Sequence, residues 1–456
     1  MNKWEELDKK YIWHPFTQMK DWTETEQLVI ERGEGVKLYD TGGREYYDGV
    51  SSLWVNIHGH RRGEIDRAVK NQIDKIAHSS LLGLINQPSA ELAERLVRIM
   101  PPGLCRVFYS DDGSTAVEAA IKIAFQYWRH QGRPEKRRFI NLADSYHGDT
   151  VGAVSVGNID AFHRAYRDLL FGTTKMSCPS FFHRKNTGLK TEGEFLAFLL
   201  EELESYLKEN AGSTAAMVVE PLVQAAAGML IQPAGYLRGI RDITRRHGVL
   251  LIVDEVATGF GRTGGMFACE REEVSPDIIC LSKGITAGYL PLGATITTGE
   301  IYNAFLGEYT DHKTFYHGHS YTGNPLACAA GVASLDIFER DRVIENLPPK
   351  IAVIAEHLRK IAGMEFTADV RHLGMLAGIE LARDRDKRIP FDPALLAAAG
   401  VCRRARHYGL ITRNIGDVIV FMPPLASTEA EIDDMLSRLE RAMDDAFRSL
   451  AAGFTV

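Results

Sequence analysis

Two residues with useful chemistry, Asp254 and Lys283, stand at the ends of two short apolar runs of the 456-residue chain. Residues 249–253 and 278–281 are uninterrupted stretches of aliphatic residues and cysteine, typical of strands buried on both faces of a parallel sheet. Ligands of such sheets bind just beyond the carboxyl ends of the strands. An acid and a lysine delivered there by separate strands would suit a ligand with a cationic ring nitrogen and a carbonyl group.

A third apolar run, residues 217–219, ends at Glu220 and is followed by Pro221. Three polar endings of this kind are harder to ascribe to chance than one, and we expect all three at the same edge of one sheet. Pyridoxal phosphate presents both a ring nitrogen and a carbonyl, and proteins bind it with a Schiff-base lysine and an acidic partner for the ring nitrogen. The pattern therefore predicts pyridoxal phosphate as the cofactor.

Gly113 and Ser114 open a predicted helix directly after a predicted strand at 105–109. N–H groups at a helix start have no acceptor within the helix, and the helix dipole favours an anion there. A phosphate site and an ordinary serine cap both fit this junction. Beyond the predicted strand at 138–142, Tyr146 could offer a flat face to a ring, although a lone tyrosine is more often a packing residue.

A glycine-rich segment, residues 259–264, matches the dinucleotide fingerprint G-x-G-x-x-G. Five residues separate it from the preceding strand, Arg262 lies inside it, and no clear amphipathic helix follows, so a loop that passes near the site is the better interpretation. The sequence contains no metalloprotease, P-loop or α/β-hydrolase motif. His317 and His319 have no carboxylate or cysteine at ligand spacing, so we expect no metal.

The chain divides into three predicted parts. Residues 1–60 form an arm and part of a small domain, with a hairpin at 36–48. Residues 61–330 alternate helical and strand patterns and form a large, doubly wound, mostly parallel-sheet domain that binds the cofactor. Residues 331–456 form an α+β domain, so the fold class is α/β with a smaller α+β domain made from both termini. Arg413 in this last part has donors suited to a carboxylate, whereas an unassisted arginine is usually a surface charge.

The composition is that of an ordinary globular protein, with 45% hydrophobic and 25% charged residues and a net charge of -7. This mild acidity argues against nucleic acid as a partner. No apolar run approaches the roughly 20 residues of a membrane span, the first residues lack a signal-peptide core, and the six cysteines are scattered. We expect a cytoplasmic protein that acts on small molecules.

These features together resemble the class III aminotransferases of the fold type I pyridoxal-phosphate family, over essentially the whole chain. The most specific part is residues 254–264 followed by 282–284. The resemblance implies that Lys283 forms the Schiff base and that Asp254 binds the ring nitrogen. It also implies a homodimer with shared active sites. The further cofactor contacts are then expected from Gly113 and Ser114 at the phosphate, Tyr146 and Val256 on the ring faces, His147, Glu220, and Ser320 of the partner subunit, where the family more often has Thr.

At a finer level, residues 13–19, 51–54, 146–150 and 323–328 resemble the biotin-pathway subfamily, which aminates 8-amino-7-oxononanoate to 7,8-diaminononanoate. Substrate contacts would then come from Phe16, Leu53, Trp54, Asp149 and Arg413. Members that use S-adenosylmethionine as donor typically have Tyr in place of Phe16 and Trp in place of Leu53. The chain therefore looks more like the branch that takes its amino group from lysine.

The expected reaction is a ping-pong transamination in which Lys283, Asp254 and Tyr146 are the catalytic residues. A broad-specificity omega-amine (amine or polyamine:pyruvate) aminotransferase would share every cofactor residue and stays open as an alternative. An NAD-dependent oxidoreductase would require a proper fingerprint. A non-catalytic protein of this fold would be expected to lose Lys283 or Arg413, and both are present.

Overall fold

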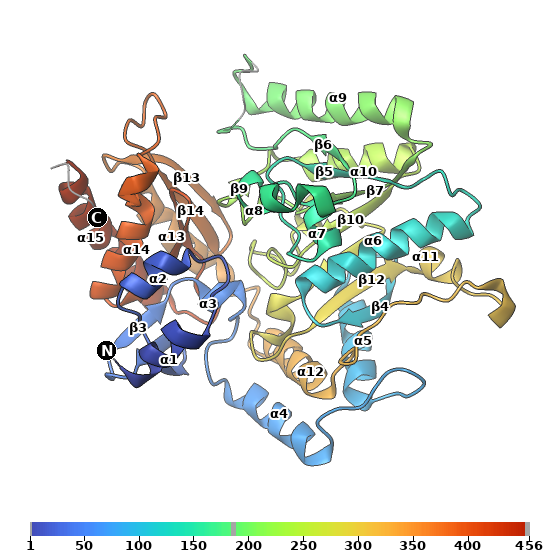
Figure 1. Cartoon of the computed structure of the whole chain (residues 1–456), viewed down its shortest axis with the longest axis horizontal. Coiled ribbons are helices and arrows are strands. Elements are labelled where there is room, and N and C mark those ends of the chain that lie inside the picture. The colour runs from blue at the N-terminus through green and yellow to red at the C-terminus, as the bar shows by residue number, and fades with distance from the viewer. Residues whose placement is uncertain (1, 184–187, 452–456) are drawn as a thin grey trace.

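The computed structural model describes residues 2–183 and 188–451. Figure 1 shows a larger part built around one sheet, with a smaller part packed at its side. Both labelled ends of the chain lie in the smaller part, so segments from the beginning and the end of the sequence build it together (Figure 1).

The larger part is organised around a seven-stranded sheet of order β4-β12-β11-β10-β7-β5-β6. The strand β12 runs antiparallel to both of its neighbours, and the paired strands from β11 to β6 are parallel. This confirms the predicted fold class. The strands are β4 (Leu104–Ser110), β5 (Arg138–Leu142), β6 (Thr174–Met176), β7 (Thr214–Val219), β10 (Leu250–Asp254), β11 (Ile278–Leu281) and β12 (Gly293–Thr298).

The three apolar runs predicted as strands are β7, β10 and β11, and every residue in them is buried. Their side chains alternate between two hydrophobic clusters, one on each face of the sheet. Ile252 packs with the residues of α6 on one face, whereas Leu251 and Val253 pack on the other. Burial on both faces is the physical reason why these strands are apolar without interruption.

Helices cover both faces of this sheet (Figure 1). Their starts follow ordinary capping rules: Asp112 and Thr115 form a capping box at α6, and Asn324 caps α12 with Pro325 at its first position. The helices are α4 (Gly63–Lys75), α5 (Gln87–Ile99), α6 (Gly113–His130), α7 (Val151–Val156), α8 (Asp160–His163), α9 (Glu192–Asn210), α10 (Tyr236–Arg246), α11 (Gly299–Asn303) and α12 (Pro325–Arg340). Shorter elements are η1 (Arg164–Leu169), η2 (Cys269–Glu272), η3 (Lys283–Thr286), η4 (Tyr309–Asp311), β8 (Val223–Gln224) and β9 (Leu230–Ile231).

The smaller part contains two four-stranded sheets, β13-β14-β17-β16 and β1-β2-β3-β15. In the second sheet β15 pairs in parallel with β3, Leu410 opposite Tyr47, which joins the two ends of the chain. The strands are β1 (Ile30–Glu34), β2 (Lys37–Asp40), β3 (Glu45–Asp48), β13 (Thr367–Leu373), β14 (Leu376–Leu381), β15 (Leu410–Ile411), β16 (Arg413–Ile415) and β17 (Val418–Phe421).

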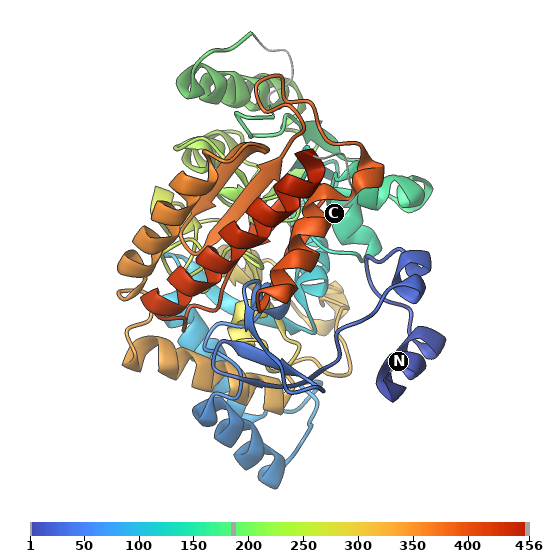
Figure 2. The same cartoon turned by 90° about the vertical axis from the view of Figure 1, so that its left-hand side faces the viewer.

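Three helices of the smaller part cover one face of its β13-β14-β17-β16 sheet (Figure 2): α13 (Leu347–Ile361), α14 (Ala397–His407) and α15 (Glu429–Ala451). The remaining elements are α1 (Lys3–Tyr11), α2 (Met19–Glu24), α3 (Ser51–Trp54) and η5 (Pro393–Leu395). The boundary expected at 330 falls inside α12, which therefore runs through it. In the residues that the structure describes, no helix is both long and apolar enough to cross a membrane.

Candidate active site

A cavity of about 380 Å³ lies at the carboxyl ends of the parallel strands. The segments that follow β5, β7, β10 and β11, together with the start of α6, all contribute to its wall. Its lining includes Trp54, Asp112, Gly113, Ser114, Tyr146, His147, Gly148, Glu220, Asp254, Val256, Ser282 and Lys283. The sheet thus brings together the three polar strand endings that the sequence predicted at one edge.

Asp254, the last residue of β10, is 5% exposed. Its Oδ2 lies 2.7 Å from Nδ1 of His147, and its Oδ1 accepts the backbone N–H of Val256 at 3.0 Å. Because an ionised carboxylate can only accept, this arrangement assigns the Nδ1 proton to His147. Each oxygen still has a lone pair for a further donor. The carboxylate that faces the cavity is therefore buried, held by two contacts and able to accept another hydrogen bond.

Lys283 begins η3 in the left-handed backbone region, with φ of 44°. Its Nζ lies 4.9 Å from the ring centre of Trp54 and has no hydrogen-bond or ion-pair partner among the described residues. Burial lowers the pKa of Lys283 to about 8, against the opposing charges of Asp254 and Glu220. The amine can therefore lose its proton near neutral pH, as a nucleophile or a proton carrier must.

Two glycines keep the start of α6 open. A Cβ on Gly113 would lie 2.6 Å from Cγ1 of Val256, and a Cβ on Gly148 would lie 2.1 Å from Oγ of Ser114. The Oγ of Ser114 accepts the backbone N–H of Asp149 at 3.1 Å, which leaves its own O–H free to donate. The first N–H groups of α6 and this hydroxyl form a donor set suited to a phosphate.

Glu220, directly after β7, is buried, and burial raises its pKa to about 7. Its two oxygens accept the backbone N–H groups of Tyr146 at 3.0 Å and Ala225 at 2.9 Å. The carboxyl group therefore fixes the loop that carries Tyr146. The hydroxyl of Tyr146 donates to Oδ2 of Asp149 at 2.7 Å, although Asp149 itself is exposed and does not line the cavity.

The residues predicted to contact substrate lie in different places. Trp54 is 6% exposed and lines the cavity, whereas Phe16 is 61% exposed and lies edge-on to Tyr146, with ring centres 6.4 Å apart. Arg413, on β16, forms no ion pair within the described residues, and burial lowers its pKa. Leu53 lines a separate cavity together with residues such as Trp22.

Ser320 is exposed and lies outside the lining of the cavity. Its predicted role belongs to the partner subunit's site and stays a prediction.

The glycine-rich segment forms a chain of turns rather than a strand-to-helix junction. Its Arg262 is 1% exposed and donates to the carbonyl oxygens of Pro423 at 2.8 Å and Asn56 at 2.9 Å. Burial lowers the pKa of Arg262 to about 9. The segment thus ties the two parts of the molecule together beside the cavity, and no helix follows it in the way a dinucleotide site requires.

Sequence reasoning missed one wall of the cavity, formed by Thr286 and the residues from Gly288 to Leu292, together with Ala225 and Ala226. Gly288 and Pro291 mark a turn in the sequence, which was the available signal. Most of their neighbours are small or apolar, and Tyr289 uses its hydroxyl to donate to Oδ1 of Asp66 at 2.9 Å, so none of them stands out in the sequence.

The donor set fits pyridoxal phosphate. A lysine amine without a hydrogen-bond or ion-pair partner among the described residues, a buried carboxylate with lone pairs to spare, and free donors at the start of α6 match its carbonyl, ring nitrogen and phosphate. Tyr146 and Val256, predicted to contact the two faces of the ring, line the same cavity.

Comparison with known families supports this reading of the cavity. Residues 19–443 match the family described as aminotransferase class-III. The chain is 53% identical over 436 residues to the adenosylmethionine-8-amino-7-oxononanoate aminotransferase of Geobacter sulfurreducens, covering 96% of each chain. It is 49% identical over 445 residues to the enzyme of the same name from Aquifex aeolicus, covering 98% of this chain and 97% of the other.

Two solved structures extend the likeness to three dimensions. The adenosylmethionine-8-amino-7-oxononanoate aminotransferase of Methanocaldococcus jannaschii matches with a TM-score of 0.92 and 45% identity, over 97% of this chain and 98% of the other. An omega transaminase from Pseudomonas jessenii, in complex with PMP, matches with a TM-score of 0.94 and 30% identity, over 99% of this chain and 100% of the other.

Proposed function

Because the chain belongs to the class III aminotransferases, which are pyridoxal-phosphate-dependent enzymes, we propose that it transfers an amino group to 8-amino-7-oxononanoate in biotin synthesis. The observation that carries this proposal is the cavity itself: Lys283, Asp254 and Tyr146 converge in it. Burial is the main cause of the lowered pKa of Lys283, and the charge of Arg413 lowers it slightly further; Arg413 lies outside the lining of the cavity and has no ion-pair partner in the described chain. The names of the similar enzymes supply the substrate, which the cavity alone does not identify.

Each protein group has a separate task in this reaction. Bound pyridoxal phosphate supplies an aldehyde that captures amines and a ring that delocalises carbanion charge. Lys283 would hold the cofactor, and its Nζ, about half of which is neutral at pH 8, would move the proton at the substrate carbon. Asp254 would hold the ring nitrogen, and His147 fixes the orientation of its carboxylate. Arg413 binds the carboxylate end of the oxo acid and so positions its ketone.

For the amino donor we propose lysine, because Phe16 and Leu53 stand where the users of S-adenosylmethionine typically have Tyr and Trp. The names of the similar proteins point the other way, since they specify adenosylmethionine. Phe16 is the stronger of the two arguments, because it lies against Tyr146 while Leu53 lines a different cavity. The two donors are therefore competing outcomes of one assay.

A broad omega-amine aminotransferase is the second candidate function. The structural match to the Pseudomonas jessenii omega transaminase favours it, and every cofactor residue would be the same. The two candidates differ in the acceptor: pyruvate and simple amines would be turned over efficiently by the second and poorly by the first.

We further propose that the enzyme acts as a homodimer. Several large apolar side chains lie open on the surface of the single chain, among them Leu82 at 91%, Ile85 at 86% and Tyr316 at 72% exposure. Exposed apolar side chains of this size mark association surfaces when they gather into a patch. Sedimentation at micromolar concentration should give twice the mass of the chain, and a monomeric active enzyme would contradict the proposal.

The test of function uses the purified holoenzyme with 8-amino-7-oxononanoate as acceptor. Lysine and S-adenosylmethionine are supplied separately, and the donor half-reaction is followed by loss of the cofactor's absorption band. Formation of 7,8-diaminononanoate supports the biotin-pathway proposal, and turnover of pyruvate without the oxo acid would replace it with the second candidate. If S-adenosylmethionine alone bleaches the band, the lysine proposal fails.

A further inference from the structure

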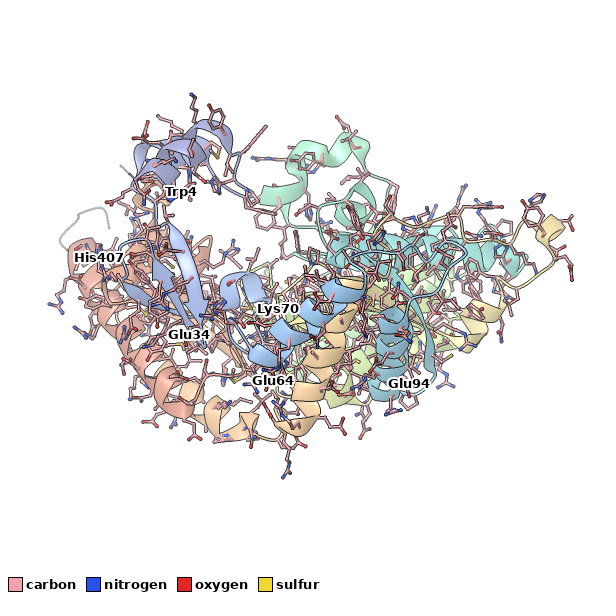
Figure 3. The ribbon with its side chains drawn as sticks, turned by 90° about the horizontal axis from the view of Figure 1, so that it is seen from below. Trp4, Glu34, Glu64, Lys70, Glu94 and His407 are labelled. Carbon is pink, nitrogen blue, oxygen red and sulfur yellow. The ribbon has the colours of Figure 1, made fainter. Side chains whose placement is uncertain are left out.

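An N-terminal arm, residues 3–24, carries Phe16 to the mouth of the site. The helices α1 and α2 form the two halves of the arm, and the loop 12–18 joins them. Figure 3 shows the arm, marked by Trp4, beside the small part, with its loop directed toward α8. The rings of Phe16 and Phe162, the latter in α8, lie edge-on with centres 5.2 Å apart. The loop thus bridges from the arm to the wall of the site.

Phe16 occupies a strained backbone position. Its φ is 51°, in the left-handed region that bulky residues rarely adopt, and its side chain is 61% exposed. A conformation of this kind persists only when its surroundings enforce it, and such positions concentrate at ligand clamps. Something in the arm must therefore hold the loop.

The holding contacts converge on Asp8. Both of its carboxylate oxygens lie 2.9 Å from Nε2 of His14, and Oδ2 accepts Nε1–H of Trp22 at 2.8 Å. The rings of His14 and Trp22 lie 4.0 Å apart, and the backbone N–H of His14 points to the sulfur of Met19. The carboxylate of Asp8 on α1 therefore binds both the loop, at His14, and α2, at Trp22. His14 lies two residues before Phe16.

The rest of the arm does not depend on this grip. Lys9 donates to the carbonyl oxygen of Thr25 at 2.6 Å, and Glu5 accepts the backbone N–H of Gln27 at 3.2 Å. These contacts fasten α1 to the segment beyond α2. Loss of Asp8 should therefore release the loop and leave α1 in place.

We propose that Asp8 is a positioning residue, which holds Phe16 against Tyr146 through His14 and Trp22 and thereby sets the affinity of the site for its amino donor. The inference rests on the proposed function for the role of Phe16 as a substrate contact. Asp8 touches no substrate and acts through the loop.

The test is a double-mutant cycle on the holoenzyme, with variants Asp8→Ala, Phe16→Ala and the pair. The donor is lysine or S-adenosylmethionine, or benzylamine if neither reacts, and bleaching of the cofactor band gives the apparent donor affinity and the limiting rate. Asp8→Ala should weaken donor affinity about tenfold with little change in the limiting rate, as expected for the loss of charge-assisted hydrogen bonds. In the Phe16→Ala background the same substitution should have almost no further effect.

Two variants serve as controls for this cycle. Trp22→Phe removes one of the donors to Asp8 and should reproduce part of the effect. Asp21→Ala removes an exposed carboxylate of α2 and should leave donor affinity unchanged.

Equal effects of Asp8→Ala with and without Phe16, or an unchanged donor affinity, would overturn the inference. So would loss of the cofactor band or a large fall in melting temperature in Asp8→Ala. Failure of the wild-type enzyme to aminate 8-amino-7-oxononanoate would count against the proposed function alone, because the cycle needs only an amine that reacts.

Discussion

Replacing Asp254 with asparagine would test the pairing of this carboxylate with the cofactor's ring nitrogen. The volume is unchanged, but one acceptor oxygen becomes an amide NH₂. In the native protein both oxygens are in use, one toward His147 and one toward the N–H of Val256. Asparagine keeps both contacts only if His147 moves its proton to Nε2, an atom without a hydrogen-bond partner in the part of the chain that the structure describes. The resulting cost to folding is about 1–3 kcal/mol.

The functional cost should be larger than the folding cost. Removing one partner of a buried ion pair costs about 3–5 kcal/mol, because the other charge stays buried without compensation. If that loss falls on the transition state, kcat/KM decreases by a factor of about 10² to 10⁴. Asp254 is 5% exposed, so water has little access to compensate for the missing charge.

The assay measures the donor half-reaction by loss of the cofactor band, with cofactor content determined separately. Reconstitution with N1-methylated pyridoxal phosphate, whose ring nitrogen is permanently charged, should restore part of the rate in Asp254→Asn. Asp242→Asn, an exposed position on α10, controls for the substitution itself. A variant that folds, binds cofactor and keeps kcat/KM within tenfold of wild type would refute the pairing.

Three further predictions follow from the same cavity. Lys283→Ala should abolish turnover and the protein-linked cofactor band together, and a variant that keeps both in absorption and rate measurements would contradict the assignment. Gly113→Ala places a Cβ 2.6 Å from Val256, and overpacking of about 1–3 kcal/mol should weaken cofactor affinity roughly tenfold in a fluorescence titration. The added substitution Val256→Ala should relieve that clash, and an unchanged affinity in the single variant would be inconsistent with a tight cradle. The pKa of Glu220 is raised from 4.5 to about 7, so its contribution to apoprotein stability is present below pH 4.5 and is lost as pH rises to about 7. Denaturant unfolding should therefore show Glu220→Gln gaining about 3 kcal/mol relative to wild type across that window, and parallel pH profiles would show that Glu220 ionises normally.

The large sheet was predictable from sequence where its strands are buried on both faces. The runs at β7, β10 and β11 are apolar throughout, and the structure begins and ends them within a few residues of the predicted positions. The strand β12 was not predicted because three threonines interrupt its apolar pattern. In the structure the hydroxyl of Thr295 is buried and donates to the carbonyl oxygen of Ala116 at 2.7 Å. Its antiparallel direction depends on which strands lie beside it, and a local pattern carries no information on that.

The candidate site was predictable where a charged residue stands at the end of an apolar, buried strand. Asp254 ends one buried strand and Lys283 lies just beyond another, and a buried charge at either place needs a partner. The placement of Leu53 was not predictable, because it depends on an unusual backbone: Ser52 and Trp54 both have positive φ, in a kinked segment. The kink sends Trp54 into the cofactor cavity and Leu53 into a neighbouring one.

The floor of the site, where Asp254 and Glu220 lie, and its mouth, where Phe16 lies, differ in how well they tolerate substitution. This difference explains how one family can share a cofactor and differ in substrates. On the floor, Asp254 and Glu220 are buried, and each is tied to at least two other groups, so a substitution leaves buried partners unsatisfied. At the mouth, Phe16 is largely exposed, and changes at exposed positions usually alter stability by no more than about 0.5 kcal/mol. Substitutions at the mouth should therefore cost less stability than substitutions on the floor. For this reason whole-chain identity is a strong guide to the cofactor and a weak guide to the donor, which we propose is selected by Phe16 and the arm that holds it.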